Sequence, residues 1–280
     1  MSIDLHTHTT ASDGTLSPAD LVSYAQTKHL EALAVTDHDT VEGIEEAVAA
    51  AEHSGLELVP GVEISAEFPQ GTLHILGYYI DYRNSSLHKS LGVLQDARAE
   101  RNPKIVLNLQ ALGINISYAE IVQEAGTGLV GRPHFAQLLL KKGYVKSVQE
   151  AFDRYLKKGS PAYEEKFRFP IKDAISMIAD AGGIPVLSHP FTLNCNGQQL
   201  EYQVKTWLGL GLQGIEVYYS EHDSMQTKQY TELARKYKLA ITGGSDFHGQ
   251  TVRGIDLGTG KGNLTIPYSV LEGLKQKKFQ

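Results

Sequence analysis

The sequence of 280 residues has little of several features that would mark other classes of protein. Its single cysteine, Cys195, cannot form an intramolecular disulfide, which predicts a reducing, cytoplasmic setting. No apolar run approaches the roughly 20 residues that a membrane-spanning helix needs. The N-terminus carries neither a basic nor an apolar signal segment. We therefore expect a cytoplasmic protein with no membrane partner.

The sequence also lacks an excess of positive charge. Its 26 lysines and arginines face 32 aspartates and glutamates, for a net charge of -6. This balance argues against a basic surface for long duplex nucleic acid, but not against a small anion held by metal ions and a few arginines. The 41% hydrophobic and 21% charged residues are typical of a globular domain.

Short apolar runs that end in polar residues predict the fold. The first three alternate with amphipathic helical stretches at Pro18–Lys28 and Val41–His53, and Ser17 before Pro18 suits a helix N-cap. This alternation predicts an α/β fold with a parallel sheet or barrel. The runs are Ser2–His8, Glu31–Asp37, Leu56–Ile64, Leu73–Ile80, Ile184–His189, Leu212–Tyr218 and Leu239–Ser245.

The alternation stops between residues 85 and 173, where nearly every stretch has a helical pattern. Ser86–Leu112 is a long amphipathic run in which Pro103 is expected to introduce a kink. We therefore predict a barrel made of residues 1–84 and 174–280, with residues 85–173 as a helical insertion.

Histidines and acidic residues follow or lie within most of the predicted strands. His6 and His8 are two apart on a strand, so their side chains leave the same face. Each histidine could be a separately hydrogen-bonded core residue, but so many strand ends favour one shared metal site. The nine candidate ligands are His6, His8, Asp13, His38, Glu63, His74, His189, Asp246 and His248.

The number and type of these ligands bear on the metal. A single zinc takes three or four protein ligands, so nine candidates indicate two or three ions with a bridging carboxylate. Imidazole and carboxylate without thiolate fit manganese, iron or zinc and do not choose between them.

Taken together, these motifs resemble the polymerase and histidinol phosphatase (PHP) family. The matching stretches are "DLHTHTTASDGT", "VTDHDT", "PGVEIS", "LHILGY", "LSHP" and "GGSDFHG". The resemblance implies a distorted barrel of seven β/α units with a trinuclear metal centre. It further implies three sets of ligands: His6, His8, Glu63 and Asp246; Glu63, His74 and His189; and Asp13, His38 and His248. Asp13 stands where many members have a histidine.

The helical insertion is similar to one PHP branch, that of nucleoside 3′,5′-bisphosphate phosphatases and 5′→3′ exoribonucleases. This implies a metal-dependent phosphoesterase that removes the 3′-phosphate of a nucleoside 3′,5′-bisphosphate by attack of a metal-bridging hydroxide. An exoribonuclease acting on short 5′-phosphorylated RNA is the alternative. A C–N bond hydrolase and a non-catalytic metal-binding regulatory domain are alternatives of other classes.

Two further stretches carry candidate substrate-binding residues. In "GLVGRPH", Arg132 follows a glycine-rich loop and suits bidentate phosphate binding, with His134 as a further donor. The alternative makes Arg132 a surface residue and Pro133–His134 a helix start. In "IEVYYSEHD", strand alternation turns Glu216 and Tyr218 to one side, toward substrate, although Glu216 could instead orient a ligand histidine.

The remaining candidates lie next to the predicted ligands. His222 is placed where a general acid could reach a leaving alcohol, and the alternative is an exposed loop histidine. Asp37 is expected to serve catalysis by supporting a neighbouring ligand. Asp39 is expected to cap the helix that follows it.

Overall fold

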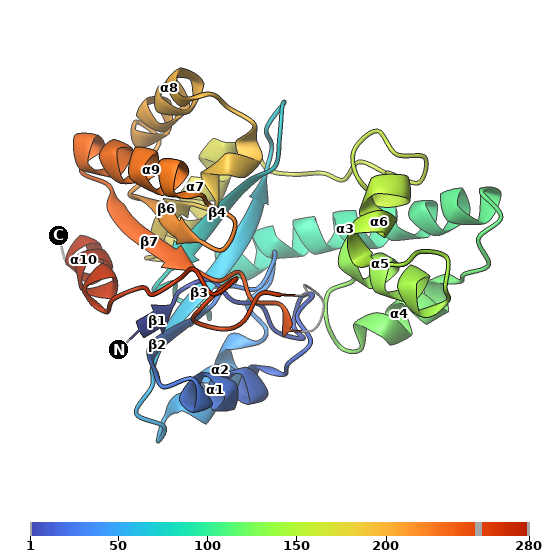
Figure 1. Ribbon diagram of the computed structural model, residues 1–280, viewed down its shortest axis with the longest axis horizontal. Coiled ribbons are helices and arrows are strands. Elements are labelled where there is room, and N and C mark those ends of the chain that lie inside the picture. The colour runs from blue at the N-terminus through green and yellow to red at the C-terminus, as the bar shows by residue number, and fades with distance from the viewer. Residues whose placement is uncertain (1, 250–253, 279–280) are drawn as a thin grey trace.

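The computed structural model describes residues 2–249 and 254–278. One seven-stranded sheet runs in chain order from β1 to β7. β7 returns to β1, where the Leu5 amide donates to the Gly243 carbonyl at 3.2 Å, so the sheet forms a nearly closed barrel (Figure 1). This confirms the predicted α/β barrel. The strands are β1 Ser2–Asp4, β2 Leu30–Val35, β3 Glu57–Ala66, β4 Leu73–Tyr78, β5 Ile184–Leu187, β6 Gly214–Tyr219 and β7 Ala240–Gly244.

The sheet departs from the predicted parallel arrangement at β4, which is antiparallel to both β3 and β5. Only residues 67–72 connect β3 to β4, too few for the crossover that parallel neighbours require. The prediction of a parallel strand is therefore wrong at this point, since no helix separates β3 from β4. As a consequence, the beginning of β4 lies at the same edge of the sheet as the carboxyl ends of the parallel strands.

Two hydrophobic clusters lie on the two faces of the barrel wall. Along β2, Leu33 and Val35 join the cluster under the outer helices, while Ala32 and Ala34 join the interior cluster. This alternation is the strand period of two. The covering helices are α1 Pro18–Thr27, α2 Ile44–Ala51, α7 Ile171–Asp180, α8 Gly197–Leu208 and α9 Ser224–Tyr237, with α10 Ser269–Lys278 contributing to the interior cluster.

The outer helices begin where the local sequence predicts. The Ser17 hydroxyl caps α1 by accepting from the Asp20 amide, with Pro18 in the first turn, as expected. Within the described residues, none of the helices combines the length and the apolar character needed to cross a bilayer.

The helices of the insertion stand to one side of the barrel (Figure 1). α3 is one 27-residue helix that continues through Pro103. Its first half contributes Leu91 and Leu94 to the barrel core, and its second half contributes Ile105 and Leu109 to a separate core. The division at residue 85 stays a proposal, since α3 belongs to both cores. The elements are α3 Ser85–Ala111, α4 Tyr118–Ala125, α5 Arg132–Lys141, α6 Val148–Ala151 and a π-helical turn, η1, Phe152–Leu156.

Candidate metal centre

The nine predicted ligands lie together at one edge of the barrel. Those on parallel strands sit just beyond the strand ends: His6 and His8 after β1, His189 after β5, and Asp246 after β7. His74 reaches the same place from the second position of β4, because that strand runs in the opposite direction. The antiparallel strand thus supplies a ligand that a parallel strand would have carried to the other end.

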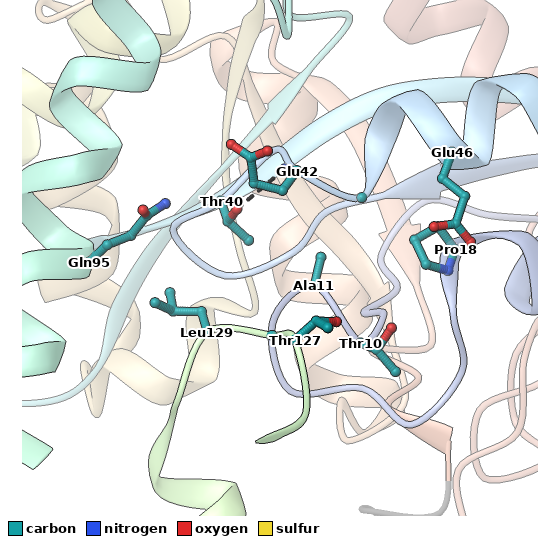
Figure 2. Close-up of a pocket in the computed structure, with 11 residues that line it drawn as sticks. Thr10, Ala11, Pro18, Thr40, Glu42, Glu46, Gln95, Thr127 and Leu129 are labelled. Atoms are coloured by element: carbon teal, nitrogen blue, oxygen red, sulfur yellow. Dashed lines mark hydrogen bonds between the residues drawn. The ribbon is translucent and has the colours of Figure 1, made fainter. Parts of the chain in front are cut away.

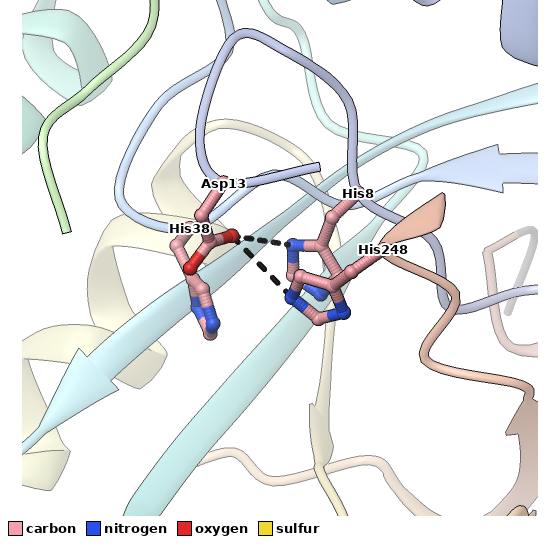
Figure 3. A group of neighbouring side chains, drawn as sticks. All are labelled: His8, Asp13, His38 and His248. Atoms are coloured by element: carbon pink, nitrogen blue, oxygen red, sulfur yellow. Dashed lines mark ion pairs between the residues drawn. The ribbon is translucent and has the colours of Figure 1, made fainter. Parts of the chain in front are cut away.

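Three groups of ligand atoms could each hold a cation, since the atoms in each group lie within 4.8 Å of one another. In the first of them the side chains point toward a common centre (Figure 3). The groups are His8, Asp13, His38 and His248; His6, His8, Glu63 and Asp246; and His38, Glu63 and His74. The resemblance placed His189 with Glu63 and His74, where the third group has His38.

Glu63 is at the middle of the cluster. Its Oε1 lies 2.9 Å from both His74 Nδ1 and His189 Nε2. Its Oε2 lies 3.0 Å from His38 Nδ1 and 3.3 Å from His6 Nε2. A carboxylate with imidazoles around both oxygens has the geometry of a group shared between two cations.

Further contacts hold the imidazoles in place. His6 Nδ1 donates to Glu216 Oε1 at 2.9 Å, and Glu216 Oε2 accepts from the His189 amide at 2.7 Å. With its remaining ring proton on Nδ1, His6 would turn the lone pair of Nε2 toward a bound cation, as ligand histidines do. Burial would lower the pKa of the free imidazole, yet Glu216, Asp246 and Glu63 together raise it well above its usual value, so a cation would replace the Nε2 proton. Glu216 is fully buried with both oxygens engaged, which favours its orienting role over contact with substrate.

The chemistry of the cluster fits bound cations. Five of its side chains have buried nitrogen or oxygen atoms that lie close to one another but form no hydrogen bond of good geometry among the described residues. Each buried atom left unsatisfied costs about 1–3 kcal/mol, a cost that coordination would remove. The atoms are His6 Nε2, both ring nitrogens of His8, His38 Nδ1, Glu63 Oε2 and Asp246 Oδ1.

The electrostatics divide the ligands of the cluster. Against the effect of burial, Asp246 and Asp13 raise the pKa of His248 to about 9, so this imidazole holds a proton until a cation replaces it. Burial alone would raise the pKa of Glu63, yet His38, His74 and His6 hold that pKa well below its usual value. Burial lowers the pKa of His8 to about 3, helped by His248 and His38. His8 is therefore neutral and Glu63 ionised near neutral pH, the forms in which both bind metal.

The backbone at this edge is unusual. Asp39, His189 and Asp246 all have positive φ angles, of 54°, 22° and 58°. Such strain is found at sites that the surrounding structure holds in a required geometry. A Cβ on Gly244 would lie 2.3 Å from the His6 Cβ, so only glycine lets β7 approach His6 this closely.

Asp37 supports the loop that carries Asp13. Its carboxylate accepts from the Thr9 amide and the Thr9 hydroxyl, both at 2.7 Å, and from the Ser12 hydroxyl at 2.6 Å. Because these contacts tie down the chain on both sides of the loop, Asp37 acts as a positioning residue in this arrangement.

Asp39 does not cap a helix, so that prediction is wrong. α2 begins five residues later, with Gly43 at its N-cap. The Asp39 carboxylate is instead fully buried and binds Arg98 at 2.6 Å and Lys166 at 2.8 Å. The sequence analysis missed both cations, because neither lies in a strand-end motif.

The tyrosine at the site is Tyr219, not the predicted Tyr218. A bulge between Glu216 and Tyr218 breaks the alternation on which the prediction depended. The Tyr219 hydroxyl therefore donates to Asp246 Oδ2 at 2.7 Å, while the Tyr218 ring packs against the hydrophobic clusters.

His222 is buried, which excludes the exposed loop histidine considered above. Its Nδ1 donates to the Val217 carbonyl at 2.9 Å, and its ring lies against Tyr219 and Phe191. Nε2 of the neutral ring is then an acceptor, and burial lowers the pKa of the imidazole. The role of His222 as a general acid stays a prediction.

Arg132 and His134 open α5 at the edge of the insertion. The Gly131 amide donates to His134 Nδ1 at 2.9 Å, so the neutral ring carries its proton on Nε2. The His134 ring lines a cleft. Arg132 Nη1 donates to the Leu156 carbonyl at 3.1 Å, and the guanidinium lies over the Tyr163 ring. The helix start considered for this stretch is thus present. Substrate binding by Arg132 and His134 stays a prediction.

Two cavities lie beside the loop that carries Asp13. The smaller, about 390 Å³, lies between the barrel loops, α3 and residues 127–129 and has no cationic side chain in its lining (Figure 2). The larger, about 1030 Å³, runs from Asp13 and His134 across the insertion to Phe152. This cleft connects the metal centre to the insertion and is the better candidate for substrate.

Comparison with known proteins agrees with the site. A family model described as the PHP domain matches residues 4–163, which is more than half of the chain. The chain belongs to the PHP domain family. Metal-dependent phosphoester hydrolysis is therefore its enzyme class, and the resemblance seen in the sequence is confirmed.

Relatives of this PHP chain cover nearly its whole length. A 3′,5′-nucleoside bisphosphate phosphatase from Chromobacterium violaceum is 33% identical over 92% of this chain and 90% of its own. A 5′-3′ exoribonuclease from Haemophilus influenzae is 35% identical over 88% and 89%. A solved structure described as an amidohydrolase from C. violaceum, with bound sulfate and no metal, has a TM-score of 0.90 at 30% identity and covers 99% and 97%.

Proposed function

We propose that this PHP phosphoesterase releases phosphate from a small nucleotide, with the 3′-phosphate of a nucleoside 3′,5′-bisphosphate as the leading candidate. The observation that carries the proposal is a cluster of cation ligands with buried arginine and lysine side chains directly beside it. A phosphate ester needs both, because it brings about two negative charges near neutral pH.

The nine clustered side chains would hold two or three divalent cations, of manganese, iron or zinc. Such cations lower the pKa of bound water and neutralise charge on a phosphoryl group. The protein's own part is orientation: Glu216 fixes the His6 ring, Asp37 fixes the loop of Asp13, and Tyr219 fixes Asp246.

Arg132 and His134 are proposed to bind substrate. A guanidinium forms two parallel hydrogen bonds with a phosphate, and only one Arg132 donor is used within the described protein. The His134 ring lines the large cleft next to Asp13 and would add a neutral donor.

The second candidate function, 5′→3′ exoribonuclease activity on short RNA, is favoured by the size of the large cleft. A cavity of about 1030 Å³ that extends from Asp13 to Phe152 has room for more than the reacting nucleotide. The chemistry at the metal centre would be the same for both substrates. The C–N hydrolase alternative is less suited, because an amide brings no charge for the buried cations to neutralise.

A phosphate-release screen tests the proposal. The metal content of the purified protein is measured. Phosphate release is followed with mono- and bisphosphorylated nucleotides, and release of nucleoside 5′-monophosphate is followed with 5′-phosphorylated oligoribonucleotides. We expect the highest kcat/KM with a nucleoside 3′,5′-bisphosphate. Strong activity on oligoribonucleotides with none on mononucleotides would reverse the order, and amide turnover without phosphate release would end the proposal.

Arg132→Ala separates substrate binding from metal binding. Loss of a charged hydrogen-bond donor is expected to lower kcat/KM by about 10- to 100-fold while metal content stays at the wild-type level. Arg154→Ala is the matched control, since Arg154 lies on the same insertion but pairs with the surface residue Glu150. Loss of metal from Arg132→Ala would show that its assigned role is wrong.

A further inference from the structure

The large cleft leads from the metal centre along the insertion. His134, Gln137 and Leu140 line it from α5 at intervals of three residues, so one face of that helix borders the cleft. The start of α5 lies at the metal centre, since a Cβ on Gly131 would be 3.6 Å from Asp13 Oδ2. A molecule held at the metals could therefore extend along this helix face within the same cavity.

Beyond His134 the insertion lines the cleft with apolar side chains. Leu140, Val148 and Phe152 pack against the core of the insertion, and all three also border the cleft. Each of them is partly exposed. Val148 and Phe152 are four residues apart and so share a helix face. An aromatic ring at such a position can offer its flat side to another planar group.

The cationic side chains that line the cleft are already paired. Lys141 Nζ lies 2.7 Å from both carboxylate oxygens of Glu124, and Lys261 Nζ lies 2.6 Å from Glu221 Oε1. All four of these residues border the cleft. Away from Asp13, the described lining therefore has no excess charge of either sign. An uncharged group suits this part of the cleft better than a phosphate, which would find no counter-charge there.

The backbone and a neighbouring cation hold the Phe152 ring in place. The Lys157 amide donates to the Phe152 carbonyl at 2.9 Å, five residues back, which is the bond of a π-helical turn. Such turns are rare and occur frequently at functional sites. The guanidinium carbon of Arg132 lies 6.0 Å from the centre of the ring. A ring that is already ordered loses little freedom when a ligand packs on it.

We propose that Phe152, with Val148 and Leu140 beside it, is the platform on which the nucleobase of the substrate stacks. This inference rests on the proposed phosphoesterase function and assigns recognition of the base to the insertion. The cleft has the polarity of a nucleotide, with cation ligands at one end and a neutral apolar surface at the other. Stacking uses the flat face that every base has, so the platform would favour nucleotides over other phosphate esters with little choice among bases.

The test compares ligands that differ only in the base. The kinetic pair is adenosine 3′,5′-bisphosphate and its abasic analogue, in which hydrogen replaces the base at C1′. The binding pair is adenosine 5′-monophosphate and its abasic analogue, whose Kd values are measured by calorimetry. A nucleoside 5′-monophosphate is a product of both candidate reactions, so the binding pair applies to either. The wild-type metal-loaded protein is expected to have the higher kcat/KM and the lower Kd with the base present.

Phe152→Leu is the informative variant, because leucine still fills the apolar wall but has no flat face. It is expected to reduce the advantage of the base by about 5- to 100-fold in both pairs, with little change for the abasic members. Phe152→Tyr keeps the ring and should keep the advantage.

Tyr155→Leu is the matched control. Tyr155 lies on the same π-helical turn and packs against the same core, but it is not among the described residues that line the cleft. Both leucine variants remove one ring from the insertion, and their Tm values show whether they cost similar stability. Tyr155→Leu should leave the advantage of the base unchanged.

The outcomes separate the platform from the proposed function. Loss of the base advantage in Phe152→Leu alone supports the platform. An equal loss on both members of each pair, the same loss in Tyr155→Leu, or a wild type that does not distinguish either pair would overturn it. Absence of phosphate release from any substrate would end the proposed function, while a Kd difference that Phe152→Leu removes would still support the platform.

Discussion

The edge of the barrel and the adjoining face of the insertion carry buried charges of opposite sign. At the barrel edge, Glu63, Asp246 and Asp13 are held ionised among imidazoles, which suits cations. On the insertion, the buried Arg98 and Lys166 share the single carboxylate of Asp39, and the buried Arg101 contacts a neutral amide oxygen. This difference is why we propose that the insertion contributes to substrate binding, since a phosphate ester carries negative charge that the carboxylates of the barrel edge would repel.

The two regions are joined at the loop that bears Asp13. The Leu129 amide donates to the Ala11 carbonyl at 3.0 Å, and a Cβ on Gly128 would lie 2.1 Å from the Thr10 carbonyl oxygen. Only glycine permits so close an approach. The insertion is thus docked on a metal-site loop, which fixes the distance between the two charges.

The largest expected effect is on the barrel side. Replacing Asp246 or His6 with alanine removes a group of the central cluster, so we expect loss of metal and turnover below detection. Metal is measured in the purified protein and phosphate release in the same preparation. His53→Ala is the control, because His53 is exposed on the helical side. Full metal content with normal turnover in Asp246→Ala would contradict the site.

Asp39→Asn tests the link between the two charged regions. Asparagine tolerates the positive φ of this position and keeps the shape, but it leaves the buried Arg98 and Lys166 without their shared counter-charge. We expect the free energy of unfolding to fall by about 3–5 kcal/mol, measured by denaturant unfolding.

A control and a second variant sharpen that result. Glu45→Gln breaks the exposed pair with Arg83 and should change stability by no more than about 1 kcal/mol. Adding Arg98→Met and Lys166→Met to Asp39→Asn should restore much of the loss, because no unpaired charge remains. A stability unchanged by Asp39→Asn alone would show that water already solvates the two cations.

The same comparison explains what the sequence could predict. The ligands at strand ends could be predicted from the sequence, because period-two hydrophobic patterns that end in His6, His189 or Asp246 mark one edge of a barrel. The buried cations could not be predicted, because the sequence around Arg98 and Arg101 has the pattern of an ordinary solvent-exposed helix face. Only the docking of α3 on the barrel buries them.

Errors inside the barrel have local causes. β4 reverses direction because its connection is short, and the β6 bulge exchanges Tyr218 for Tyr219 at the site. The short connection could have been recognised from the spacing of the third and fourth predicted strands. The bulge leaves no signal in the hydrophobic pattern. Asp39 was taken for a cap because its true partners are 59 and 127 residues away in the chain.

Glu216→Gln should have a smaller effect than loss of a ligand. The amide can still accept from the His189 backbone, but it no longer presents a charged oxygen to His6 Nδ1. Changes of this kind lower metal affinity by about 10- to 100-fold, which a chelator competition would measure. Glu221→Gln, at an exposed pair with Lys261, should leave affinity unchanged. Equal affinities of Glu216→Gln and wild type would show that Glu216 does not orient His6.

The smallest expected effect decides between two adjacent tyrosines. Tyr219→Phe removes the hydroxyl that donates to Asp246 Oδ2 but keeps the ring beside His189, so we expect kcat/KM to fall by about 2- to 10-fold. Tyr218→Phe should cause no loss, because the Tyr218 ring packs in the hydrophobic clusters. The two variants make the same chemical change at neighbouring positions. The ratio of their kcat/KM values therefore tests whether the bulge places Tyr219, and not Tyr218, at the site. If Tyr218→Phe lost the more activity, strand alternation would hold through β6 and Tyr218 would face the metals.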